Sequence, residues 1–202
     1  MNSLEKLYWK LKSKYPQLHQ QWQLWCKWPK TEKEKEEIII GAILTQRTNW
    51  QNVEKAINNL RNAHLCSLCD IKQVEPKMLY PLIKPVGFYR TKAEYLREIS
   101  KFIVEKYRHL AKMAQQNLFD LRKELLSLRG VGKETADSIL LYALEKPIFV
   151  IDEYTKRLAQ KEGLSSQFSY DALQKLFEAQ LKKEVRLFQE FHALIVIEGK
   201  NH

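Results

Sequence analysis

The stretch LRGVGKETA, residues 128–136, decides how this part of the chain folds. Apolar residues recur at helical spacing up to Leu128, Gly130 and Gly132 interrupt the pattern, and helical spacing resumes at Lys133. We therefore expect one helix, a tight Gly-x-Gly turn and a second helix. Two glycines permit positive φ in the turn and leave its backbone N–H groups uncovered.

Uncovered N–H groups at the start of a helix can bind a phosphate oxygen. Gly130, Val131 and Gly132 are therefore candidate phosphate contacts, and Lys133 adds a positive charge beside them. An ordinary corner between two helices shows the same sequence pattern. The turn alone therefore does not decide the function.

The remaining sequence predicts an all-α protein. Gly and Pro number only 6 each in 202 residues, which disfavours the many hairpins of a β-sandwich or barrel. The net charge of +10 favours nucleic acid as a partner, although surface charge can also serve solubility alone. The sequence shows no signal peptide and no membrane span, so we expect a cytoplasmic, nucleoid-associated protein without membrane contact.

Three further motifs surround the Gly-x-Gly turn. LTQRTNW (44–50) and GFYRTKA (87–93) precede it, and VIDEYTKR (150–157) follows. In this order the four motifs resemble the helix-hairpin-helix DNA glycosylases of the endonuclease III superfamily, over about residues 30–200. The resemblance implies two helical lobes with the active-site cleft between them. A barrel of residues 30–146 carries the hairpin, and residues 1–29 and 147–202 form the second lobe.

By this resemblance Asp152 is the catalytic aspartate. Breaking an N-glycosidic bond builds positive charge on the sugar, and a nearby carboxylate stabilises that charge or activates water. Asp152 also suits the N-cap of the helix that follows it. A non-catalytic DNA-binding module that uses only the hairpin is the rival interpretation, but pure DNA binding needs no carboxylate that faces DNA.

At position 134 the glutamate of this sequence differs from the residue that bifunctional members of the family have there. Those proteins have at this place a lysine that forms a Schiff base with the sugar and enables strand cleavage. A glutamate cannot do this, and Lys133 points about 100° away around the helix. The departure implies a monofunctional enzyme without lyase activity. Glu134 is also an ordinary first-turn acid that the helix dipole favours.

Two residues match the family positions that handle the duplex. Gln46 lies where the family places a side chain that fills the gap left by a flipped nucleotide. Phe88 lies where it places an apolar wedge. Unstacking a base costs a few kcal/mol, so base flipping requires both groups. Taken alone, Gln46 would be a polar residue at a helix end and Phe88 a half-buried loop aromatic.

Tryptophans suggest the substrate. Trp25, Trp28 and Trp50, with Lys200, resemble the base pocket of the cluster-free 3-methyladenine DNA glycosylase III branch. Aromatic faces bind cations, and alkylated purines are cationic. We therefore expect excision of an alkylated purine from double-stranded DNA. Mismatched thymine or uracil, or adenine opposite a damaged guanine, remain alternatives, and Lys200 fits a surface lysine equally well.

The resemblance also bears on cofactors. Many relatives carry an iron–sulfur loop of four cysteines after a segment like residues 192–196, whereas the cysteines here are Cys26, Cys66 and Cys69. We expect no cluster and no other cofactor, and we expect a monomer. The family hairpin often holds a monovalent cation on backbone carbonyls, which here would be those of Leu126, Leu128 and Val131.

Overall fold

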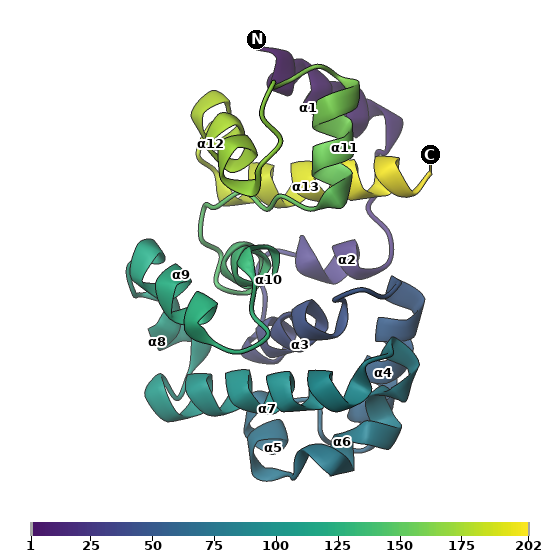
Figure 1. Ribbon diagram of the computed structural model, residues 1–202, viewed down its shortest axis with the longest axis vertical. Helices are drawn as coiled ribbons and strands as arrows, with labels where there is room; N and C mark the ends of the chain where they lie inside the picture. The colour runs from purple at the N-terminus through teal and green to yellow at the C-terminus, as the bar shows by residue number, and fades with distance from the viewer. Residues whose placement is uncertain (1, 202) are drawn as a thin grey trace. The chain divides into compact units, whose positions relative to one another are not determined.

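The computed structural model describes residues 2–201, and every regular element in them is helical (Figure 1). This confirms the all-α prediction. None of the described helices is long and apolar enough to cross a membrane. The α-helices are α1 (Ser3–Lys14), α2 (Gln21–Trp25), α3 (Glu32–Leu44), α4 (Trp50–Asn62), α5 (Leu68–Gln73), α6 (Pro76–Ile83), α7 (Tyr89–Lys106), α8 (Leu110–Ala114), α9 (Leu118–Ser127), α10 (Lys133–Ser138), α11 (Glu153–Lys161), α12 (Tyr170–Gln180) and α13 (Val185–Lys200). A 3-10 turn, η1 (Lys84–Val86), precedes α7, and a π-helical stretch, η2 (Ile139–Ala143), continues α10.

The chain divides into two compact units. The central unit is continuous from Trp28 to Leu144 and contains α3 to α10 with η1 and η2. The terminal unit joins both ends of the chain, up to Lys27 and from Glu145 onward.

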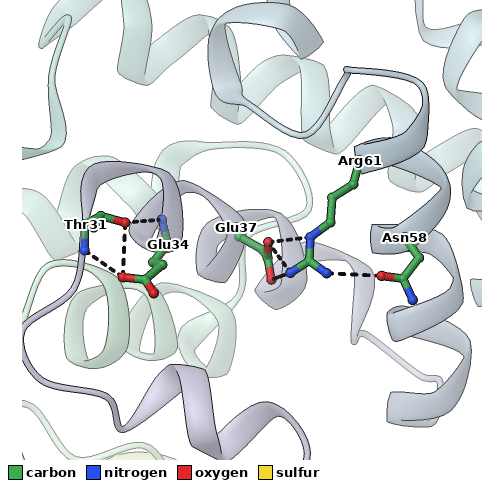
Figure 2. A network of polar contacts seen from close by, with 5 residues as sticks. All are labelled: Thr31, Glu34, Glu37, Asn58 and Arg61. Carbon is green, nitrogen blue, oxygen red and sulfur yellow. Dashed lines mark hydrogen bonds and ion pairs between the residues drawn. The ribbon is translucent and has the colours of Figure 1, made fainter.

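Helix α3 is the core of the central unit. Its second half, residues 38–44, is buried and packs against η2, α7 and α4. Figure 2 shows how its first half is fixed: Thr31 and Glu34 form a capping box at the helix start. Farther along, the Glu37 carboxylate accepts hydrogen bonds from the Arg61 guanidinium of α4, with Nε to Oε2 at 3.0 Å.

Acidic side chains of α3 also cap two neighbouring helices. Glu32 accepts a hydrogen bond from the Leu110 N–H at 2.6 Å, and Glu36 accepts one from the Leu68 N–H at 3.1 Å. These N–H groups begin α8 and α5 and would otherwise lack an acceptor. Burial raises the pKa of the Glu36 carboxyl. The charged end of α3 thus orders the helices around it.

The segment that leads to the predicted catalytic residue lies in the terminal unit. Residues 148–151 have the apolar sequence typical of a β-strand, but they pair with no other strand among the described residues. Side chains of α12 satisfy this backbone instead: the Phe149 N–H donates to Glu178 at 2.9 Å, and its carbonyl accepts from Gln174 at 2.7 Å. The Phe149 ring packs on Phe177, with centroids 4.5 Å apart.

Candidate active site and hairpin

The hairpin turn, residues 128–132, joins α9 to α10, and its two glycines differ. Gly130 has φ +83°, and a Cβ there would lie 2.3 Å from the ring of Tyr95. Gly132 has φ −86°, and a Cβ there would meet nothing within 4 Å. Both glycines permit positive φ, but only Gly130 adopts it.

Some backbone N–H groups of the hairpin turn already have acceptors. The Val131 N–H donates to the Leu128 carbonyl at 3.2 Å, and the Arg129 N–H donates to Glu98 of α7 at 3.0 Å. The N–H groups of Gly130 and Gly132 find no acceptor within residues 2–201. Two donors at a helix start thus remain for an outside ligand.

A buried ion pair joins the two helices of the hairpin. Arg122 of α9 donates through Nε and a terminal nitrogen to the two carboxylate oxygens of Asp137 of α10, at 2.7 and 3.0 Å. Asp137 is fully buried. Two parallel hydrogen bonds fix orientation as well as distance. The sequence alone did not indicate this pair.

Gln46 lies beside the hairpin turn. Its Nε2 donates to the Gly130 carbonyl at 2.8 Å and to Thr135 Oγ1 at 3.1 Å. Together with the turn it lines a hollow of about 490 Å³ in the central unit. The exposed side chains of Arg47 and Glu134 line the same hollow, and Arg47 has φ +52°. Arg47 was not among the predicted site residues.

Phe88 protrudes from the central unit. Its side chain is 68% exposed, although large apolar side chains are usually buried. The residue has φ +46° and directly follows Gly87, which has φ +65°. These two left-handed residues direct the chain from η1 into α7. The ring is therefore accessible from outside the unit, and its role as a wedge stays a prediction.

Asp152 caps α11 in the terminal unit and is 9% exposed. Its Oδ1 accepts hydrogen bonds from the N–H and the Oγ1 of Thr155, at 2.7 and 2.8 Å. Its Oδ2 lies 3.6 Å from Nε2 of His192, an electrostatic contact longer than a hydrogen bond. One oxygen is therefore committed to the cap, and the other faces an imidazole.

These contacts decide the charge of Asp152. Burial raises the pKa of the carboxyl, but the neighbouring His192 and the Thr155 hydrogen bonds outweigh it, so the pKa lies below its ordinary value of 3.8. The carboxylate is therefore ionised at neutral pH. His192 was not predicted as a site residue. No local pattern marks it, because it lies on α13 and meets Asp152 only in the folded unit.

The predicted base-pocket residues belong to both units. Lys200 lines a pocket of about 510 Å³ in the terminal unit, together with Trp22. Trp25 is not one of its lining residues; like Trp22 it is buried, and the two rings pack edge-on with their centroids 5.7 Å apart. In the central unit Trp28 is 46% exposed and Trp50 is half-buried. The assignment of Trp25, Trp28, Trp50 and Lys200 to a base pocket stays a prediction.

Lys200 is chemically unusual. Burial lowers the pKa of its ammonium, and the negative charge of Asp152 opposes this shift. The direction of the shift makes the neutral amine more accessible than for an ordinary surface lysine. Lys200 and the carboxylate of Asp152 therefore influence one another within the terminal unit.

The surroundings of Cys66 disfavour metal binding. Burial raises the pKa of the Cys66 thiol to about 11, which disfavours the thiolate that metals bind. Cys69 is exposed, and both residues lie in the central unit, whereas Cys26 lies in the terminal unit. The absence of a cluster stays a prediction.

Comparison with known proteins reveals extensive similarity. A protein of Methanocaldococcus jannaschii, named as a DNA repair glycosylase, is 46% identical over 88% of this chain and 79% of its own length. Endonuclease III of Thermotoga maritima is 34% identical over 68% of this chain and 62% of its own.

A solved structure covers the whole chain. The 3-methyladenine DNA glycosylase MagIII of H. pylori, crystallised with 1,N6-ethenoadenine, is 30% identical, with a TM-score of 0.81 over 100% of this chain and 98% of its own. The sequence model of the HhH-GPD superfamily matches residues 40–183, a range that includes the hairpin turn and Asp152. The chain therefore belongs to the HhH-GPD superfamily of base excision DNA repair proteins and is a DNA glycosylase.

Proposed function

We propose that this glycosylase is monofunctional and excises an alkylated purine such as 3-methyladenine, with Asp152 as its catalytic residue. The observation that carries the proposal is the ionised carboxylate of Asp152, held at a helix N-cap by Thr155 and faced by His192. A fixed negative charge is what a developing oxocarbenium ion requires.

Base release is a hydrolysis in which water attacks the sugar carbon and the bond to the base nitrogen breaks. The base departs with the bonding electrons, and an abasic sugar remains. Thr155 occupies Oδ1 of Asp152, so Oδ2 is the oxygen that stabilises the sugar cation or accepts the proton of the water. A base that already carries positive charge is a good leaving group and needs no strong acid.

The proposed duplex contacts come from the central unit. The N–H groups of Gly130 and Gly132, with Val131 between them and Lys133 beside them, bind a backbone phosphate. Phe88 wedges the duplex and Gln46 borders the gap. A monovalent cation on the carbonyls of Leu126, Leu128 and Val131 would strengthen phosphate binding. The Leu128 oxygen can take part because it keeps a second lone pair beside the one that accepts the Val131 N–H.

Three observations support an alkylated purine as the substrate. Trp28 is 46% exposed in the central unit and already binds a cation, the Lys30 ammonium, 5.8 Å from its ring centroid, and Trp22 lines the pocket of the terminal unit. The negative charge of Asp152 acts on Lys200 and partly offsets the positive charge of its ammonium at the pocket. The H. pylori relative is named for 3-methyladenine.

A panel of duplex oligonucleotides tests this proposal. Each duplex carries one lesion: 3-methyladenine, 1,N6-ethenoadenine, uracil opposite guanine, thymine opposite guanine, or adenine opposite 8-oxoguanine. Free base and strand breaks are scored with and without alkali. We expect release of 3-methyladenine to be fastest, with breaks only after alkali. Preferential release of uracil, thymine or adenine would overturn the substrate assignment, and release of no base would overturn the activity.

A further inference from the structure

Lys92 of α7 is a buried lysine, only 3% exposed. Its Nζ donates to the carbonyl oxygens of Leu44 and Val86, at 2.8 and 2.9 Å. These residues are the last of α3 and the last of η1. Carbonyls at a helix end have no partner within the helix and carry its negative dipole end. One ammonium therefore serves two helix ends that are distant in sequence.

The burial of this charge is unfavourable for stability. Within the described residues, Lys92 pairs with no carboxylate, and both of its acceptors are backbone carbonyls. Burial lowers the pKa of the ammonium to about 8. An apolar side chain of similar length would fill the same space without desolvating a charge. The advantage of a lysine at this position is therefore that it connects the carbonyls of Leu44 and Val86.

The two acceptors directly precede the segments proposed to enter DNA. The gap-filling segment, residues 45–47, follows Leu44, and the wedge segment, residues 87–88, follows Val86. We infer that Lys92 is a positioning residue that fixes the spacing between Gln46 and Phe88 for base flipping. The inference rests on the proposed function, because it takes Gln46 and Phe88 as the residues that enter the duplex.

The contacts of Gln46 extend this connection. Its amide is held by Gly130 and Thr135, so the gap-filling segment is fixed at one end by Lys92 and at the other by the hairpin. The exposed Phe88 has no such contact through its own side chain, and its position depends on the backbone that Lys92 holds at Val86. Loss of Lys92 should therefore displace the wedge more than it disturbs the fold.

Base excision from two duplexes tests this role. In one duplex 3-methyladenine lies opposite thymine; in the other it lies opposite an abasic site, where flipping costs less. We expect Lys92→Met to slow single-turnover excision from the paired duplex by about tenfold or more, and from the second duplex by less than about threefold. Lys101→Met, an exposed lysine of the same helix, should change neither rate.

A double-mutant cycle separates positioning from general damage. If Lys92 acts through Phe88, Lys92→Met should have little further effect on the paired duplex in a Phe88→Ala background. An equal loss on both duplexes, unchanged rates on both, or additive effects in the cycle would overturn the inference. If the Lys92→Met variant does not unfold cooperatively on heating, excision from the same two duplexes is measured with Lys92→Arg instead. A selective loss on the paired duplex then supports the inference, and an equal loss on both duplexes or unchanged rates on both overturn it.

Base release by the wild-type protein tests the proposed function separately. Absence of base release from both duplexes would refute that function, and an unimpaired Phe88→Ala variant would refute the wedge. With the wild type active and Phe88→Ala slowed on the paired duplex, the result for Lys92 concerns Lys92 alone.

Discussion

Asp152 and His192 face one another at 3.6 Å, between Oδ2 and Nε2, across two helices of the terminal unit. The imidazole also packs edge-on against Trp22, with ring centroids 5.8 Å apart. His192 therefore links the carboxylate to the wall of the terminal-unit pocket. It counters the effect of burial on the pKa of Asp152.

Asp152→Asn should reduce base excision by more than about tenfold, or about 1.4 kcal/mol, because it removes the charge that stabilises the sugar cation. Asparagine is a good N-cap, so α11 should persist and DNA affinity should be equal or higher. Single-turnover excision and equilibrium binding measure the two effects. A variant that retains more than a tenth of the wild-type rate would contradict the catalytic role.

The pH dependence of stability gives a second test at Asp152. The pKa of its carboxyl is lower in the folded protein than its ordinary value of 3.8. The resulting stabilisation is present above pH 3.8 and is lost as pH falls through the folded pKa. The stability difference between wild type and Asp152→Asn should therefore shrink below pH 3.8, as measured by urea unfolding. A difference that grows on acidification would contradict the lowered pKa.

His192→Phe should raise the pKa of Asp152, because the imidazole no longer counters the effect of burial on the carboxyl. The acidic limb of kcat/KM should move to higher pH, while the rate on the plateau falls less than in Asp152→Asn. A pH–rate profile from both variants measures this. An unshifted acidic limb would show that His192 does not control the carboxylate.

Gly130→Ala and Gly132→Ala should have different effects. Alanine at Gly130 meets the Tyr95 ring and requires φ +83°, so we expect destabilisation of about 2 kcal/mol or more. Alanine at Gly132 has free space and an ordinary φ, so stability should stay within about 0.5 kcal/mol while DNA affinity falls. Urea unfolding and binding titrations distinguish them. Normal DNA affinity of Gly132→Ala would argue against a phosphate at this N–H.

Lys133→Ala should weaken binding equally for damaged and undamaged duplexes, since a phosphate contact carries no sequence information. The slope of log affinity against log salt concentration should fall by about one unit. Fluorescence anisotropy over a range of salt concentrations measures the slope. A loss confined to damaged DNA would assign Lys133 to the base pocket.

The glutamate at position 134 leads to a prediction about whether the DNA strand is cleaved. Without a lysine at this position, strands should stay intact until alkali is added, and borohydride should trap no protein–DNA adduct. The matched variant Glu134→Lys tests the position itself, and a trapped adduct in that variant alone would support the assignment. Efficient trapping by the wild type would show that another lysine attacks the sugar.

Local sequence patterns predicted the helices, the hairpin turn and the cap at Asp152, because caps and turns depend on neighbours in the chain. Gly130 illustrates the limit of such prediction: the pattern placed it in a turn where glycine permits positive φ, but nothing local indicated how closely the Tyr95 ring approaches it. His192 and Lys92 act through partners far away in sequence. Their side chains carry no signature until packing brings those partners near.

The support of residues 148–151 by α12 has a consequence for the position of Asp152. Gln174 and Glu178 hold the backbone that leads to Asp152, yet neither takes part in the proposed reaction. A paired strand would fix that backbone through its main chain, largely independent of side-chain identity. Here mutable side chains of α12 do so, and Tyr170 adds a third contact, at 3.5 Å from the Ile151 N–H to its hydroxyl oxygen. Substitutions in α12 can therefore shift the backbone before Asp152 and alter the position of its carboxylate without a change at Asp152 itself.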